Sequence, residues 1–207
     1  MIRFLLISLL FLLQTSCALQ MTKDWVRSEP TQEYIENSYF SELTTDYVYK
    51  AKINVYGHKF GGILIIKKLR EEEHRVVFTT EFGNKLFDFL YQKDTFKKNF
   101  IVEYLDKKMI INTLQKDFKL LISEKAKVEG QYNIEDEIVF KTSDDKRSNF
   151  YFINKKTHTL DKIVNTSKSK QKVEVLYKEI IDGMANTIWI NHHHINLQIE
   201  LNKFAKK

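Results

Sequence analysis

Residues 103–122 read EYLDKKMIINTLQKDFKLLI, and this stretch arranges apolar and charged residues in a helical pattern. Ile110, Leu114, Phe118 and Leu121 follow one another at spacings of four, four and three residues, so they share one face of a helix. Mostly outside this stripe lie the charged residues Lys107, Lys108, Lys116 and Asp117. The pattern predicts an amphipathic helix of about four turns that lies against a sheet or plugs an open barrel.

The segments before this helix alternate between apolar and polar residues, as β-strands do. In YVYKAKINVY (47–56) the residues Tyr47, Tyr49, Ala51, Ile53 and Val55 fall on one face of a strand. Four similar segments follow, separated by short polar turns: GGILIIKKL, HRVVFTT, KLFDFLY and TFKKNFIV. We expect an antiparallel meander of about five strands here.

After the helix and a polar interval, strand-like segments resume and continue to the C-terminus. They read EIVFK, NFYFINK, LDKIVNTS, KVEVLYKEI and TIWINHHHINLQIELNKF. A sheet of this size must protect its edges and its apolar face, either by curling or by a covering helix. The sequence therefore predicts a mainly β fold, in which an antiparallel sheet of about ten strands is curled into an unclosed half-barrel and covered by the amphipathic helix.

The N-terminal residues have the features of an export signal. Arg3 precedes the apolar run FLLISLLFLL, which is too short to cross a bilayer because a helix needs roughly 20 residues for that. QTS then precedes Cys17, the only cysteine of the chain. The segment resembles a bacterial lipoprotein signal, in which the cysteine becomes the acylated first residue; Gln14 stands where the family usually has leucine. The alternative is an ordinary secretory signal that ends near a chance cysteine.

On this interpretation the chain has three parts. Residues 1–16 are the lipoprotein signal peptide, residues 17–30 are the lipidated N-terminus and a tether, and residues 31–207 form a single domain. Within the domain, TQEYIENSYFSEL (31–43) is expected to hold a short helix with Thr31 as its cap. One cysteine excludes an internal disulfide framework and a zinc site built from several cysteines.

Composition and motifs exclude several classes of function. The net charge of +6 arises from basic residues that are mixed with acidic ones rather than clustered, so we expect no nucleic-acid binding. The motifs G-x-S-x-G, G-x-x-x-x-G-K-[ST] and H-E-x-x-H do not occur. Acidic groups such as Asp144-Asp145 and Glu71-Glu72-Glu73 fall in predicted loops, where a solvated surface is the expected role. We expect neither an enzyme nor a cofactor.

The order of these elements resembles the LolB-like outer-membrane lipoproteins, which have the LolA/LolB fold. Two segments carry the resemblance: VVFTTEFGNKLFDF followed by the helix, and the closing strands from DKIVNTSKSKQKVEVLYKEI to NHHHINLQIELNKF. The resemblance implies a monomeric, lipid-anchored and periplasm-facing acceptor in the outer membrane. Its partners would be a LolA-like periplasmic carrier, acylated client lipoproteins and the membrane itself.

The resemblance also assigns a role to one loop. In Glu81-Phe82-Gly83, Phe82 and Gly83 match the apolar residue and the glycine of the family's membrane-release loop, whereas Glu81 replaces a proline. EFGN is also a hairpin connection, because Gly83 and Asn84 tolerate positive φ. Phe82 is then either exposed at the tip, where it touches the membrane, or folded back onto the rim of the half-barrel.

Transfer of acyl chains requires an apolar cavity, because moving about 40 methylenes through water would cost on the order of 30 kcal/mol. The candidate residues come from the strand faces and from the apolar stripe of the helix. They are Ile53, Val55, Ile63, Ile65, Phe87, Phe89, Ile110, Leu114 and Phe118. The sequence does not say which face of the sheet is concave.

Two other functions are compatible with the sequence. The half-barrel could hold a protein partner or another lipid, as a structural or interaction lipoprotein does. His192 and His194 share a strand face and could supply two ligands to a metal ion, but no nearby cysteine or carboxylate set completes such a site. We therefore expect solvated histidines and no metal.

Overall fold

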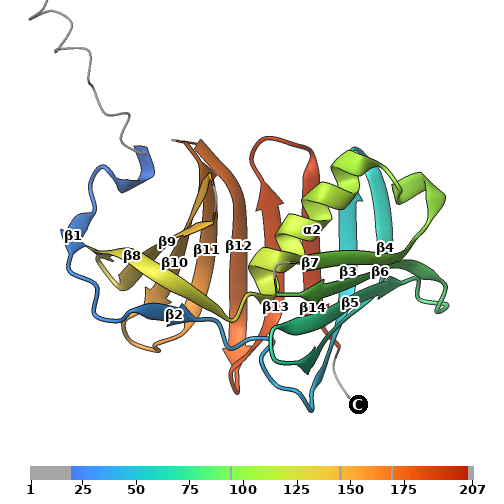
Figure 1. Ribbon diagram of the computed structural model, residues 1–207, viewed down its shortest axis with the longest axis horizontal. Coiled ribbons are helices and arrows are strands. Elements are labelled where there is room, and N and C mark those ends of the chain that lie inside the picture. Colours follow the sequence, from blue (N-terminus) through green and yellow to red (C-terminus); the bar gives the residue numbers. More distant parts are fainter. Residues whose placement is uncertain (1–19, 94, 145, 169, 205–207) are drawn as a thin grey trace, which may run out of the picture.

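The computed structural model describes residues 20–93, 95–144, 146–168 and 170–204. Within these residues, fourteen strands form one antiparallel sheet around the helix α2, Lys108–Ile122 (Figure 1). Residues 1–16, the predicted signal peptide, and Cys17 lie outside the described residues, so both the signal and the lipidation of Cys17 stay predictions. None of the helices in the described part of the chain is long and apolar enough to cross a membrane.

The sheet is continuous but open. Its strand order is β1-β8-β9-β10-β11-β12-β13-β14-β3-β4-β5-β6-β7, with β2 paired to β8 beside this path. The strands before the helix are β1 (Val26–Ser28), β2 (Tyr34–Glu36), β3 (Asp46–Val55), β4 (His58–Arg70), β5 (Glu73–Thr79), β6 (Lys85–Gln92) and β7 (Thr95–Ile101). Those after it are β8 (Lys125–Ile134), β9 (Glu137–Asp144), β10 (Arg147–Asn154), β11 (Leu160–Ser167), β12 (Lys170–Ile181), β13 (Met184–His192) and β14 (Leu197–Lys203). Two short 3-10 helices, η1 (Gln20–Thr22) and η2 (Glu103–Leu105), complete the described elements.

The meander of five strands before the helix is confirmed, and alternation explains its burial. The five apolar residues predicted on one face of β3 are all buried, while Lys50 and Lys52 between them are exposed. β3 and β4 pair in register, with Tyr49 opposite Leu64. Because the same face stays apolar from strand to strand, the sheet buries that face and leaves the other to solvent.

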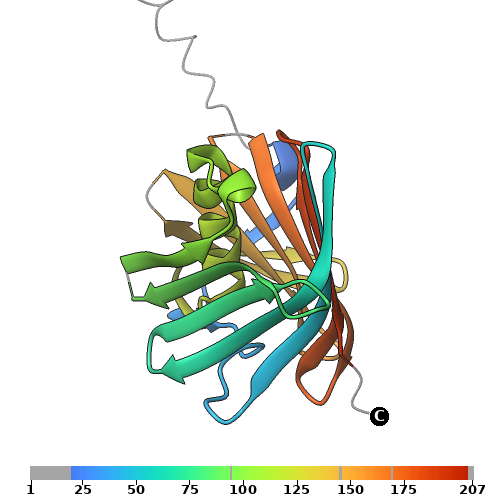
Figure 2. The ribbon, with the colours of Figure 1, turned by 90° about the vertical axis from the view of Figure 1, so that its right-hand side faces the viewer.

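The helix packs into the concavity of the sheet. Figure 2 shows the sheet curving from the orange and red strands through the cyan strands to the green ones, with α2 at the open side. Ile110, Leu114, Phe118 and Leu121 are 7%, 1%, 0% and 0% exposed, which confirms the predicted apolar stripe. The mainly β half-barrel covered by one amphipathic helix is therefore the observed fold.

The sheet has four strands more than expected: β1, β2, β8 and one from the division of the final segment. The polar interval after the helix contains β8, which pairs with β1, β2 and β9. The final segment is two strands, β13 and β14, which turn at residues 193–196. The short helix predicted in residues 31–43 is wrong: Tyr34–Glu36 form β2, because the open edge of β8 offers these residues a backbone partner.

The second half of the predicted tether belongs to the sheet. β1 pairs with β8, and Trp25 just before it packs its indole against Tyr132, Phe150 and Phe152, with ring centroids 5.6–5.7 Å apart. These rings form a second, smaller core with Val139 and Val164 on the outer face of the sheet. Residues 20–28 thus cover a face that would otherwise expose aromatic surface.

Candidate functional site

Seven of the nine residues predicted to line an acyl-chain cavity meet on the concave face. They are Ile53, Val55, Phe87, Phe89, Ile110, Leu114 and Phe118, each 7% exposed or less. The rings of Phe87 and Phe89 stack with centroids 4.6 Å apart, and the ring of Phe118 lies 5.7 Å from that of Phe87. The concave face is therefore aromatic and aliphatic, and α2 packs directly on it.

Ile63 and Ile65 lie on the opposite face. Both are half-buried, whereas their neighbour Leu64 is fully buried, and Ile63 pairs with the exposed Lys50. The segment GGILIIKKL is apolar at consecutive positions, so alternation does not reveal which residues point inward. A shift of one residue places the side chain on the other face, which explains the error.

The concave face is filled by side chains in this structure. Two cavities, of about 430 and 720 Å³, are outlined by the described residues, and none of the nine predicted residues lines either of them. Phe87, Phe89 and Phe118 are instead 0% exposed and pack on one another. Acyl-chain binding by these residues stays a prediction, and it would require α2 to move off the sheet.

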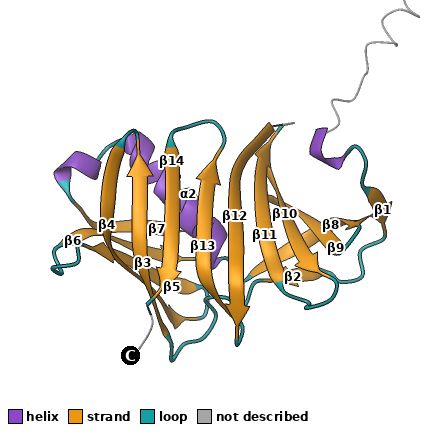
Figure 3. Cartoon of the chain, turned by 180° about the vertical axis from the view of Figure 1, so that it is seen from behind, coloured by secondary structure: helices purple, strands orange, loops and turns teal. Residues whose placement is uncertain are grey.

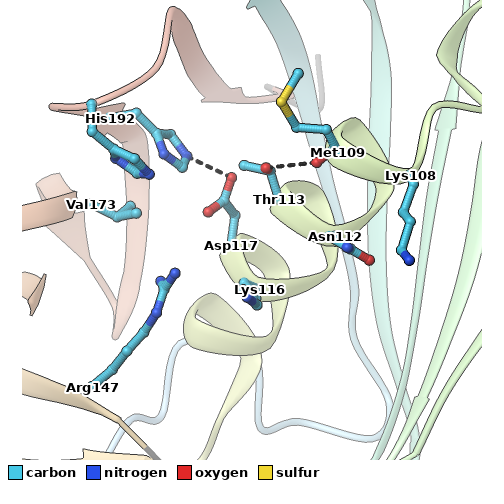
Figure 4. A pocket seen from close by; sticks show the side chains of 10 residues that line it. Lys108, Met109, Asn112, Thr113, Lys116, Asp117, Arg147, Val173 and His192 are labelled. Carbon is cyan, nitrogen blue, oxygen red and sulfur yellow. Dashed lines mark hydrogen bonds and ion pairs between the residues drawn. The ribbon is translucent and has the colours of Figure 1, made fainter. Parts of the chain in front are cut away.

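The cavity of about 430 Å³ lies between α2 and the ends of β10, β12 and β13. Figure 4 shows the side chains of Asp117 and His192 pointing toward each other across it, with Arg147 extending toward both from the β10 side. Lys116 and His194 also line this cavity. Most of the residues that line it are thus polar or charged, and several of them are basic.

Asp117 and His192 form a buried pair that joins the helix to the sheet. The Nε2 atom of His192 lies 2.9 Å from Oδ2 of Asp117, and both side chains are 2% exposed. Burial raises the pKa of Asp117, and the hydrogen bond from His192 opposes that rise. The Nδ1 atom of His192 is buried and has no hydrogen-bond partner within the described residues.

Sequence reasoning missed both members of this pair. The sequence predicts a solvated His192 and an Asp117 outside the apolar stripe, and both predictions are wrong because both side chains are buried. Asp117 follows Leu114 by three residues and precedes Leu121 by four, which is the spacing of the buried stripe itself. That spacing was the available signal that the carboxylate faces the sheet.

The remaining basic residues that line this cavity are Lys108, Lys116, Arg147 and His194. Within the described part of the chain, Lys108, Lys116 and Arg147 form no ion pair with a carboxylate, and Nη1 of Arg147 donates to Oδ1 of Asn165 at 2.9 Å. Burial lowers the pKa of His194, helped by the positive charges of Lys172, His192 and Arg147. Among the residues described, no group of three or more His, Cys, Asp or Glu is arranged to hold a metal ion.

The larger cavity, of about 720 Å³, lies at the opposite edge of the half-barrel. It is bounded by the start of β3, the end of β14 and the start of β13, which lie side by side at the lower edge in Figure 3. Tyr47, Tyr49, Met184 and Phe204 supply apolar wall. The hydroxyl of Tyr49 donates to the carbonyl of Ala185 at 3.1 Å, so its polar atom is satisfied and its ring faces the interior.

The predicted release loop connects β5 and β6, and Phe82 stands at its tip. Phe82 is 94% exposed, so it does not fold back onto the rim. Gly83 has φ +85° and its N–H donates to the carbonyl of Thr80 at 3.0 Å, which closes the turn. Nζ of Lys50 lies 3.3 Å from a carboxylate oxygen of Glu81, so the acid beside Phe82 is paired at the surface.

Comparison with known proteins rests on the fold alone. The sequence matches no protein-family model and no characterised protein. The structure is similar to the crystal structure of a LolA superfamily protein from Nitrosomonas europaea, with a TM-score of 0.52. This chain has a LolA-like fold. The similarity covers 82% of this chain and 88% of the other at 8% sequence identity, so it confirms the architecture inferred from the order of elements.

Proposed function

We propose that this protein is a lipid-anchored acceptor that takes lipoproteins from a LolA-like periplasmic carrier and inserts them into the outer membrane. The observation that carries the proposal is the LolA-like half-barrel, an open sheet whose apolar concave face is covered by a single amphipathic helix. Such a cover can be exchanged for another apolar surface. Replacing the stripe of α2 by an acyl chain keeps the concave face out of water throughout.

The energetics require direct contact with the carrier. Acyl chains gain about 0.8 kcal/mol per buried methylene, so they must pass from one apolar site to the next without entering water. The cavity lined by Tyr47, Tyr49 and Met184 is open in the present structure and could take a chain before α2 moves. The concave face beneath α2 would take the remainder.

Anchoring and release would be separate tasks. An acylated Cys17 would supply far more membrane affinity than one aromatic side chain, which gives roughly 2–3 kcal/mol when buried. We therefore assign the anchor to Cys17 and contact with the bilayer during release to Phe82. A mass measurement on protein from the membrane fraction tests the anchor, because it must show Cys17 as the first residue with acyl chains attached.

The transfer itself is tested with a carrier loaded with labelled lipoprotein. We expect label to move to this protein and native mass spectrometry to show the acylated client bound. Absence of both transfer and bound acyl chains in the full-length protein would contradict the proposal.

Phe82→Glu is expected to leave acceptance of the client intact and to lower its release into vesicles by about tenfold, because the exposed apolar contact with the bilayer is lost. Phe82→Leu keeps an apolar tip and should behave like the wild type. Leu43→Glu is the matched control, since Leu43 is also exposed, at 52%, but lies in another loop. Release that is unchanged in Phe82→Glu would remove Phe82 from the mechanism.

One observation favours a second function, that of a structural or interaction lipoprotein. The concave face is filled, with Phe87, Phe89 and Phe118 fully buried, as in a core that never opens. A stable protein partner that binds without any change in α2, together with failure of the transfer assay, would support this alternative. Hydrogen exchange of the α2 amides distinguishes the two, because the acceptor must open that helix when the loaded carrier is added.

A further inference from the structure

The cavity between α2 and the sheet carries more positive than negative groups. Among the described residues, its wall includes the side chains of Lys108, Lys116 and Arg147 and a single carboxylate, that of Asp117. That carboxylate is already engaged, because its Oδ2 atom accepts a hydrogen bond from His192. The three cations form no ion pair with a carboxylate within the described residues, so the cavity carries an excess of positive charge.

The donors come from separate elements and converge on one space. Arg147 begins β10, Lys116 lies on α2, His192 ends β13, and His194 follows in the next loop. Figure 4 shows Arg147 and His192 approaching the same space from opposite sides. The Nδ1 atom of His192 is buried and has no hydrogen-bond partner among the described residues. A purely structural cluster would be expected to satisfy such a group.

We propose that this cavity binds a phosphate-type anion, either the head group of an anionic phospholipid or a free phosphate. Arginine and lysine are the side chains that hold phosphate oxygens most strongly, through charge-assisted hydrogen bonds. The volume of about 430 Å³ leaves room for the anion and for the groups attached to it. The site goes beyond the proposed transfer function, because it concerns an anionic ligand rather than the acyl chains of a client.

The surroundings of the cavity suit an amphiphile. Met109 lines the cavity and is 54% exposed, and its sulfur accepts a hydrogen bond from the hydroxyl of Tyr56 at 3.3 Å. Tyr104, 52% exposed, stacks on Phe60 with ring centroids 5.5 Å apart. Met109 therefore places exposed apolar surface at the edge of the basic cavity, near the start of α2, so a head group could enter while its chains stay outside.

The test is calorimetric titration of the full-length protein in a non-ionic detergent with three probes. They are inorganic phosphate, dihexanoyl phosphatidylglycerol and the zwitterionic dihexanoyl phosphatidylcholine. We expect Arg147→Gln to weaken binding of the anionic probes about tenfold, because it removes one charge and keeps a polar side chain at this position. Arg27→Gln is the matched control, since Arg27 is exposed on β1, away from the cavity.

Each outcome either supports the proposed site and identifies the source of its phosphate group, or overturns the proposal. Binding of phosphatidylglycerol alone supports the site with a lipid as its ligand, and binding of inorganic phosphate alone supports it with a free phosphate. Equal affinity for phosphatidylcholine and phosphatidylglycerol would overturn it, as would unchanged binding in Arg147→Gln or an equal loss in Arg27→Gln. Because these titrations use no carrier or client, their failure leaves the transfer assay unaffected.

The pH dependence of binding is a further test, because a purely structural role of these residues would not change the affinity for the lipid. His194 faces Lys172 on β12, His192 on β13, Arg147 on β10 and the carboxylate of Asp117 on α2. Burial and the nearby cations hold its pKa below the ordinary value, so it is neutral in the free protein at neutral pH. A bound anion offsets those cations and favours the protonated ring, so phosphatidylglycerol should bind more tightly at pH 6 than at pH 8. Affinity that rises with pH would contradict this assignment.

Discussion

Gly62→Ala is expected to lower the free energy of unfolding by about 3 kcal/mol or more, whereas Gly61→Ala should leave it nearly unchanged. A Cβ atom at residue 62 would lie 1.9 Å from the carbonyl oxygen of Thr79 and 3.0 Å from Cε2 of Phe78. The first contact is with the backbone of β5, which cannot rotate away as a side chain could. The substitution therefore forces β4 and β5 apart at the wall of the core.

Gly61 is the matched control for this position. It precedes Gly62 in the same strand, is exposed, and a Cβ there would meet nothing within 4 Å. Alanine at residue 61 even removes some conformational freedom from the unfolded chain, which favours the folded state slightly. Urea unfolding of both variants, followed by circular dichroism, measures the difference. Equal stabilities would show that β5 does not approach β4 as closely as the structure has it.

Asp117→Ala is expected to destabilise the protein by about 3 kcal/mol, because it leaves buried His192 without its hydrogen-bond partner. Both side chains are 2% exposed, so water cannot replace the lost group at low cost. Asp117→Asn retains an acceptor for His192 and should cost much less. Chemical unfolding at constant pH compares the two variants.

The pH dependence of the same variants reports on the buried charge. Because the pKa of Asp117 is raised in the folded protein, the folded state binds more protons than the unfolded state above about pH 4. The stability from this group is complete below that pH and is lost as the pH rises through the folded pKa. Asp117→Asn removes the titration, so its stability should fall less than that of the wild type over this window.

A double-mutant cycle completes the test. Asp117→Ala combined with His192→Ala should cost less than the sum of the single changes, with a coupling of about 1–3 kcal/mol. Additive costs would mean that the 2.9 Å contact between the two side chains contributes nothing to the attachment of α2. The same cycle, read by hydrogen exchange of the α2 amides, shows whether the pair controls opening of the helix.

The architecture could be predicted from the sequence wherever one local period dominates. The stripe of Ile110, Leu114 and Phe118 and the alternation of β3 both result from a buried face that repeats along one element. β8 was not predicted because most of its side chains are charged or polar, so its alternation is weak. Val128 on this strand is buried through pairing and packing with other elements. Strands at the margin of a sheet owe their structure to neighbours distant in the sequence.

The sequence alone is enough to predict an antiparallel sheet with one amphipathic helix, because hydrophobic periodicity is a local property of each element. The packing of the whole chain was needed to learn that Leu64 rather than Ile63 faces inward, that Phe82 is exposed, and that α2 fills the concavity. It also brought Asp117 and His192, 75 residues apart, into contact beside Arg147. Such a site depends on the curvature and register of the whole sheet. Packing between elements sets both, so they cannot be predicted from any single segment.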